Sequence, residues 1–222
     1  MLYLLDTANV SEIKRAIDIY PIAGVTTNPT LIAKEKVKFP AILCEIRDLL
    51  GPEAMLHAQV LGRTAEAMMQ EAHDMIEVVG KALYIKVPVV AEGIKVIRQL
   101  HKEGIRTTAT AVFTPQQALL AAVSGAEFVA PYVNRLDNIC GNGAGVVGDI
   151  VKLLHMHQLS TRVLAASFKN IDQVQRVSLA GSQAVTVSAE ILDLLVDHPL
   201  TVSSIRQFSA DWEKFYGLSN SS

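Results

Sequence analysis

Cysteine is scarce in this chain, and its two cysteines form no recognisable pair or metal motif. Cys44 lies in a helical pattern and Cys140 lies in a glycine-rich loop, so there is no CxxC spacing. Small secreted domains stabilised by disulfides carry an even set of cysteines, which is missing here. The scarcity therefore excludes a disulfide scaffold, and we expect a protein of the reducing cytoplasm.

Long apolar runs and an excess of one charge are also lacking. The 222 residues carry 20 basic and 22 acidic side chains without blocks, for a net charge of −2. This balance offers no electrostatic attraction to nucleic acid or to an anionic membrane. No signal-peptide pattern opens the chain, and no apolar run could span a bilayer. We therefore expect small-molecule substrates and other copies of this chain as partners.

Short apolar runs alternate with amphipathic stretches along the whole chain. We expect strands at Leu2–Asp6, Gly24–Thr27, Met55–Val60, Leu83–Val87, Arg106–Ala111, Phe128–Tyr132, Arg162–Ala166 and Ala184–Val187. We expect helices between and after them near residues 10–19, 38–50, 64–79, 91–103, 115–124, 146–157, 171–180 and 188–197. Eight such units without a linker predict an α/β protein, a single (β/α)8 TIM barrel over residues 1–222.

Residue types that favour helix ends support these boundaries. Ser11 is a candidate cap for the first helix, and Thr114 followed by Pro115 suits the start of another. Gly104, Gly125 and Gly181 each follow a helical pattern, as terminating glycines do.

A ninth amphipathic stretch, about Thr201–Tyr216, follows the eighth unit as an additional C-terminal helix. It carries Ile205, Phe208, Trp212 and Phe215 at helical spacing. Two interpretations remain open for this apolar face. It packs across its own barrel, or it docks on a neighbouring subunit, since a closed barrel has little apolar surface left to cover.

Lys86 is a cationic residue inside the apolar run from Leu83 to Val89. Burial penalises an ammonium ion and lowers its pKa, and a neutral amine can attack a carbonyl to form a Schiff base. A paired or partly solvated lysine is the alternative interpretation.

Polar side chains stand at or just after the ends of most predicted strands, where barrel enzymes carry their catalytic groups. These residues are Asp6, Thr26, Asn28, Gln59, Lys86, Thr110, Tyr132 and Ser167. Each also has an ordinary explanation: Asp6 as a helix cap, Asn28 before Pro29 as a turn, Thr110 as barrel filling. Their predicted convergence around Lys86 favours an active site.

Arg135 with Ser167 and Lys169 is the best candidate site for a phosphate, although Lys169 is equally well explained as a surface charge. The glycine-rich run 141–145 lacks the context of a dinucleotide fingerprint and is interpreted as a flexible loop. The histidines lack ligand spacing: His155 and His157 diverge on a helix, and His57, His73, His101 and His198 are isolated. We therefore expect no metal site.

Five separated segments resemble the small transaldolase family, and the similarity extends over essentially the whole chain. They are Leu5–Asn9, Ala23–Leu31, Ile85–Pro88, Ala130–Asp137 and Leu164–Lys169. The resemblance implies a class I aldolase-type barrel in which Lys86 forms the Schiff base without metal or cofactor. It also implies that Asp6 assists proton transfers, that Asn28 and Ser167 hold substrate hydroxyls, and that Arg135 holds the phosphate with help from Ser167.

Two residues bear on the activity within that family. Transaldolases carry glutamate and phenylalanine where fructose-6-phosphate aldolases carry glutamine and tyrosine, and this chain has Gln59 and Tyr132. The resemblance thus implies reversible cleavage of fructose 6-phosphate to dihydroxyacetone and glyceraldehyde 3-phosphate, with Gln59, Thr110 and Tyr132 around an acid/base water. Residues 108–113 depart from the aldolase pattern, which bears on donor preference.

Alternatives to that activity remain open. One is transaldolase activity, which transfers a dihydroxyacetone unit between sugar phosphates. The other is a sugar-phosphate-binding barrel that has lost catalysis. The resemblance also implies a homo-oligomer, a decamer built of two pentamers.

Overall fold

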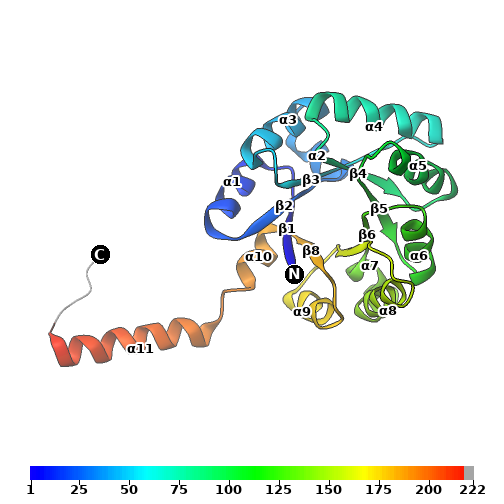
Figure 1. Ribbon diagram of the computed structural model, residues 1–222. Coiled ribbons are helices and arrows are strands. Elements are labelled where there is room, and N and C mark those ends of the chain that lie inside the picture. The colour runs from blue at the N-terminus through cyan, green and yellow to red at the C-terminus, as the bar shows by residue number, and fades with distance from the viewer. Residues whose placement is uncertain (218–222) are drawn as a thin grey trace.

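The eight predicted strands close into a barrel, as the computed structural model shows for residues 1–217 (Figure 1). Residues 218–222 of the predicted domain lie outside the described part. Each strand pairs in parallel with its neighbours, and β1 closes the barrel against β8. The strands are β1 (Leu2–Asp6), β2 (Ile22–Thr26), β3 (Met55–Gln59), β4 (Leu83–Pro88), β5 (Thr107–Val112), β6 (Phe128–Pro131), β7 (Arg162–Ala165) and β8 (Ala184–Val187). The predicted (β/α)8 fold is confirmed.

Helices follow the strands as the alternating pattern predicts, with two short additions, and all but the last of them surround the barrel. They are α1 (Val10–Ile19), α2 (Pro29–Glu35), α3 (Phe39–Leu50), α4 (Ala65–Val79), α5 (Ala91–Lys102), α6 (Pro115–Val123), α7 (Val133–Asp137), α8 (Gly143–Met156), α9 (Ile171–Leu179), α10 (Ala189–Leu194) and α11 (Pro199–Tyr216). Their buried aliphatic side chains pack against the outer faces of the strands, where Val25, Ile85 and Val87 are fully buried. This packing places the hydrophobic core between the two layers.

Two short helices were not predicted, and both follow strands at the same mouth of the barrel. In α2, Asn28 accepts a hydrogen bond from the Leu31 amide at 3.1 Å, and Pro29 takes the first helical turn. The interpretation of Asn28 and Pro29 as a plain turn is therefore wrong. Helix α7 is only five residues long, which is too short for a helical period to be recognised in the sequence.

Two local predictions about helix starts were also wrong. Asn9, not Ser11, caps α1, because that helix begins at Val10 and the Asn9 side chain accepts from the Glu12 amide. The glycine run 141–145 is a helix start as well. Asn142 caps α8, and a Cβ on the buried Gly143 would lie 2.5 Å from the Val133 carbonyl oxygen. These glycines permit close packing against α7 and do not mark a flexible loop.

The barrel interior is built of layers whose side chains come from alternate strands. The register places Lys86 in one layer with Thr26, Ala130 and Thr186, and the Thr26 and Thr186 hydroxyls lie 2.6 Å apart. His57 and Thr108 belong to the layer beneath. Aromatic side chains, chiefly Tyr84 and Phe128, fill the floor below that layer. Polarity therefore rises from the floor toward the mouth at the strands' C-terminal ends.

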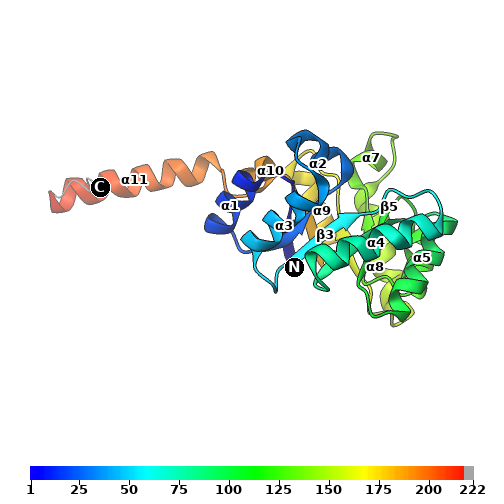
Figure 2. The same cartoon turned by 90° about the horizontal axis from the view of Figure 1, so that it is seen from above.

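Helix α11 projects away from the barrel (Figures 1 and 2), and none of its residues is buried. Its aromatic stripe is in solvent, with Phe208 69% and Phe215 83% exposed. The helix begins two residues earlier than predicted because Pro199 occupies its first turn after His198. The interpretation that this stripe packs on its own barrel is therefore wrong for the described residues.

We propose that α11 docks on a second copy of the chain. An isolated helix of this length is marginal in water, so its stability requires that the apolar face be covered. Removing residues from Thr201 onward, or replacing Phe208 with Asp, should lower the number of subunits, which light scattering gives as the oligomer mass divided by the mass of one chain. Ala210→Asp places the same charge on the opposite side of the helix and should leave the number of subunits unchanged. The same number of subunits in all four proteins would contradict the docking.

Candidate active site

The side chain of Lys86 reaches the barrel interior from β4 and is only 6% exposed. Its Nζ atom donates a hydrogen bond to the backbone carbonyl of Thr27 at 2.8 Å. Burial lowers the pKa of Lys86 from its ordinary value of 10.5, whereas the nearby Asp6 carboxylate opposes that shift. Burial thus lowers the pKa of this amine, and the described residues form no direct ion pair with it. A lysine in such a setting is suited to nucleophilic attack on a carbonyl.

Asp6 stands at the end of β1, level with Thr26 on the neighbouring strand. Its Oδ1 atom accepts the Thr26 hydroxyl at 2.6 Å, and Thr186 in turn donates to Thr26 at 2.6 Å. Asp6 is therefore not the cap of the next helix. The two hydroxyls orient the carboxylate within electrostatic reach of Lys86, which leaves the other carboxylate oxygen available for proton transfer.

Tyr132 directly follows β6, and its side chain extends toward Thr110 on the neighbouring strand β5. Its hydroxyl group lies 3.0 Å from the Thr110 hydroxyl, either of which can donate. Phe113 packs edge-on against the Tyr132 ring at 5.6 Å, and the Arg135 guanidinium lies 4.8 Å from the ring centre. Thr110 is fully buried, and through this contact it orients the phenol. A phenol held in this way can relay a proton.

Arg135 lies on α7 and Ser167 follows β7, and backbone hydrogen bonds join these two neighbouring segments. The Val133 amide donates to the Ala166 carbonyl at 2.9 Å, and the Asn134 amide donates to the Ser167 carbonyl at 2.7 Å. Ser167 has a φ of +63°, an uncommon conformation for a residue other than glycine. These bonds hold the α7 segment that carries Arg135 beside the end of β7.

Lys169 follows on the same loop and is exposed. Its amide donates to the buried side chain of Gln173, which also donates to Asp137 at 2.8 Å and Asn134 at 3.3 Å. This network anchors the loop and α7 together. The exposed Lys169 side chain follows Ser167 on the loop after β7, so the phosphate role predicted for it stays a prediction.

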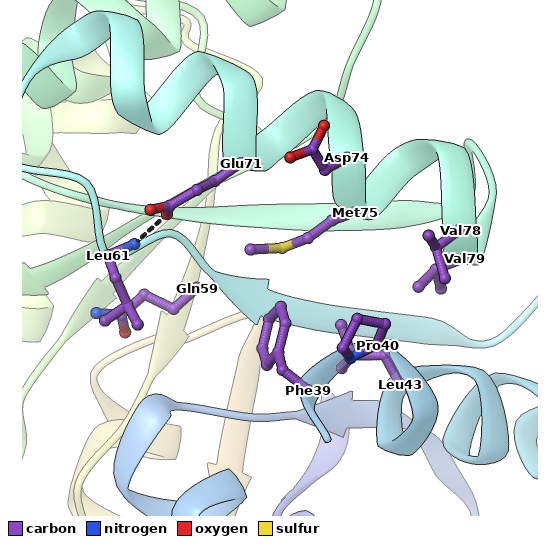
Figure 3. A pocket seen from close by; sticks show the side chains of 10 residues that line it. All are labelled: Phe39, Pro40, Leu43, Gln59, Leu61, Glu71, Asp74, Met75, Val78 and Val79. Atoms are coloured by element: carbon purple, nitrogen blue, oxygen red, sulfur yellow. Dashed lines mark hydrogen bonds between the residues drawn. The ribbon is translucent and has the colours of Figure 1, made fainter.

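Gln59 ends β3 in register with Lys86, but no hydrogen bond joins it to Thr110 or Tyr132 within residues 1–217. It also lies at one end of a groove of about 390 Å³ between α3 and α4. Figure 3 shows Gln59 beside Leu61, whose amide donates to Glu71. The role predicted for Gln59 beside an acid/base water therefore stays a prediction.

Asn28 caps α2 through its side-chain oxygen, so its amide group remains free to donate to a substrate hydroxyl. Two further members of the site gave no usable sequence signal. Thr27 acts through its carbonyl, which every residue possesses, and Thr186 was hidden in an apolar strand. His57 and Thr108, which pair below Lys86, also escaped the prediction.

Potential metal ligands do not gather within the described chain, which has no group of three or more histidine, cysteine or carboxylate side chains placed to hold an ion. The helices of the same region include none long and apolar enough to cross a membrane.

Solved structures with similar folds include two barrels. One is a dihydrodipicolinate synthase from Rhodopseudomonas palustris, with a TM-score of 0.61 and 12% identity over 94% of this chain and 77% of that chain. The other is a native KDPGal structure, with a TM-score of 0.58 and 15% identity over 85% of this chain and 82% of that chain. At these identities the likeness shows the fold alone.

The family is shown by the sequence itself. Residues 3–219 match the sequence model of the family described as transaldolase/fructose-6-phosphate aldolase. The match includes every residue of the site described above and all strands of the barrel except Leu2 at the start of β1. This chain therefore belongs to the transaldolase/fructose-6-phosphate aldolase family.

Proposed function

We propose that the protein is a class I aldolase that reversibly cleaves fructose 6-phosphate into dihydroxyacetone and glyceraldehyde 3-phosphate. The observation that carries the proposal is the buried Lys86 amine, which faces the polar mouth with a pKa lowered by burial. The proposal is also supported by the family of the chain, by a fold shared with other barrels, and by the Arg135 side chain beside Tyr132.

In the first step the neutral Lys86 amine attacks the C2 carbonyl of the ketose. The resulting carbinolamine loses water to give a protonated imine, and Asp6 moves the protons that this dehydration requires. The Thr27 carbonyl, which binds the resting ammonium, remains a hydrogen-bond acceptor for the N–H of the imine. Lys86 thus keeps one partner in both states.

In the second step the C3–C4 bond breaks. The C4 hydroxyl loses its proton, glyceraldehyde 3-phosphate leaves, and the electron pair moves into the imine to give an enamine. Tyr132, with a water held by Gln59 and Thr110, accepts that proton and returns one to C3. Hydrolysis then releases dihydroxyacetone and restores Lys86.

The phosphate end of the substrate lies toward Arg135, with Ser167 and Lys169 contributing. Arg135 supplies a planar, permanently charged donor group suited to phosphate oxygens. Its contact with the Tyr132 ring links phosphate binding to the proton-transfer group. Asn28 and Thr26 face the hydroxyl groups of the three-carbon unit.

Transaldolase activity is the second candidate, because the matched family covers both reactions. Both reactions share the enamine on Lys86 and differ in its fate. A transaldolase passes the three-carbon unit to another aldose, whereas an aldolase protonates and releases it. The hydrogen-bonded Tyr132 phenol supports the aldolase, since it supplies a proton donor near Thr110.

Lys86 should be the residue that borohydride traps in the presence of dihydroxyacetone. The adduct should form faster as pH rises and reach its plateau below pH 10.5, because the neutral amine attacks and burial lowers its pKa. Peptide mapping by mass spectrometry locates the adduct. A modified Lys81, Lys95 or Lys169, or no adduct at all, would sink the assignment.

Arg135→Ala should raise KM for glyceraldehyde 3-phosphate in the synthetic direction by roughly ten- to a hundredfold, since it removes a charged hydrogen bond. The unphosphorylated acceptor glyceraldehyde should be affected far less. The matched control is Arg176→Ala on α9, which removes an exposed arginine bonded to Asn142. Equal losses with both acceptors would show that Arg135 is structural.

Tyr132→Phe tests the choice between the two reactions. The wild type should release free dihydroxyacetone from fructose 6-phosphate without an added acceptor. The variant should lose roughly ten- to a thousandfold of that release, because the enamine loses its proton donor. Transfer to erythrose 4-phosphate should suffer less, and adding Gln59→Glu should raise the transfer-to-release ratio further. If release and transfer fall equally, Tyr132 serves only the steps that both reactions share.

A further inference from the structure

His57 and Thr108 form a buried polar pair that the proposed mechanism does not use. The His57 side chain is fully buried, and its Nδ1 atom lies 2.9 Å from the Thr108 hydroxyl. Thr108 is the register partner of Lys86, and His57 pairs in register with Tyr84, two residues before Lys86. The pair therefore forms part of the layer directly beneath the Schiff-base lysine.

The His57 ring is held firmly in place. It stacks on Tyr84 at 4.5 Å with the planes 12° apart, and Phe128 contacts it edge-on at 5.6 Å. Its second nitrogen, Nε2, is buried and has no hydrogen-bond partner among the atoms of residues 1–217. Leaving such an atom unpaired costs about 1–3 kcal/mol, so buried nitrogens usually bind protein or an ordered water.

Lys86, in the layer above His57, also has donors that the described protein atoms do not use. An ammonium group carries three N–H donors, and the described protein atoms give Lys86 one acceptor, the Thr27 carbonyl. Burial holds the pKa of His57 well below its usual range, and the nearby Lys86 cation lowers it further. His57 is therefore a neutral imidazole with one nitrogen able to accept a hydrogen bond.

We propose that His57 is a positioning residue for Lys86 and holds a buried water between its Nε2 atom and the Lys86 nitrogen. Nδ1–H donates to Thr108, Nε2 accepts from the water, and the water accepts an N–H of Lys86. The inference rests on the proposed function in that Lys86 must form the imine. Both the ammonium and the protonated imine carry an N–H, so the water stabilises both charged states from below.

Other charged and titratable groups surround the pair and set the background field. They are Asp6 on β1, Tyr84 on β4, Arg106 before β5, Glu127 before β6 and Arg162 on β7. Arg106 donates to the Tyr84 hydroxyl, which donates to Glu127, and Glu127 also binds Arg162. Asp6 binds Thr26 instead, and the other four side chains pair with one another at the floor, which leaves His57 Nε2 without a partner from that network.

The test measures how fast cyanoborohydride traps dihydroxyacetone on Lys86 as a function of pH, by intact-mass spectrometry of the full chain. His57→Phe keeps an aromatic ring but removes the Nε2 acceptor. The Lys86 ammonium then loses its water-mediated partner, so the midpoint of the pH dependence of trapping should fall by about one pH unit. His57→Gln retains an amide oxygen and should restore part of the shift. Thr108→Val removes the hydroxyl group that fixes the tautomer of the His57 ring, and it should lower the same midpoint by a smaller amount.

Tyr84→Phe is the matched control, because it disturbs the same aromatic stack without touching Nε2. It removes only the Tyr84 hydroxyl from the network at the floor, so its trapping midpoint should move far less than that of His57→Phe. An unchanged midpoint in His57→Phe would show that the pair is structural, and a higher midpoint would show that His57 is a cation. Either result overturns the proposal, and if His57→Phe does not fold, the Thr108→Val midpoint decides in the same way.

Failure of the Schiff-base step, which the aldolase and the transaldolase share, gives a different result, since the wild type would then form no adduct on Lys86 at any pH. A high-resolution crystal structure of the wild type provides a readout that does not depend on activity. It should show an ordered water within hydrogen-bond distance of His57 Nε2 and Lys86 Nζ. A direct contact between the two nitrogens, or apolar atoms alone around Nε2, would overturn the inference.

Discussion

A lysine amine inside a closed barrel is the constraint on which the rest of the site depends. Taking an ammonium ion out of water is costly, and the hydrogen bond from Lys86 to the Thr27 carbonyl offsets part of that cost. A backbone acceptor binds the cation without a full counter-charge, so its pKa stays low. An adjacent carboxylate bonded directly to the amine would stabilise the ammonium and oppose nucleophilic attack.

The layers of the barrel explain how a polar site coexists with a stable core. Tyr84 and Phe128 fill the floor with aromatic surface, and hydroxyl groups occupy the layer at Lys86. Because alternate strands supply each layer, one side chain from each of four strands meets across the barrel. The residues we propose for proton transfer therefore come from β1, β5 and the end of β6, and no single segment contains them.

The closed barrel also accounts for the position of α11. Every strand edge is already paired, and the other helices cover the outer faces, so little apolar surface remains for an eighteen-residue helix. The stripe around Phe208 and Trp212 is exposed, and we propose it as a surface for association with a second copy. The oligomer we propose would follow from the same closure that builds the active site.

The sequence by itself determined the barrel, because eight apolar runs alternate with helical periods and parallel strands must end on one face. For the same reason it placed Asp6, Lys86 and Tyr132 together. Tertiary structure alone decided the acceptor for Lys86, since a carbonyl has no residue signature, and the His57–Thr108 pair, since cross-barrel partners depend on register. It also decided that α11 leaves the barrel. A helical period shows that a face is apolar, but what covers that face depends on surfaces distant in the chain.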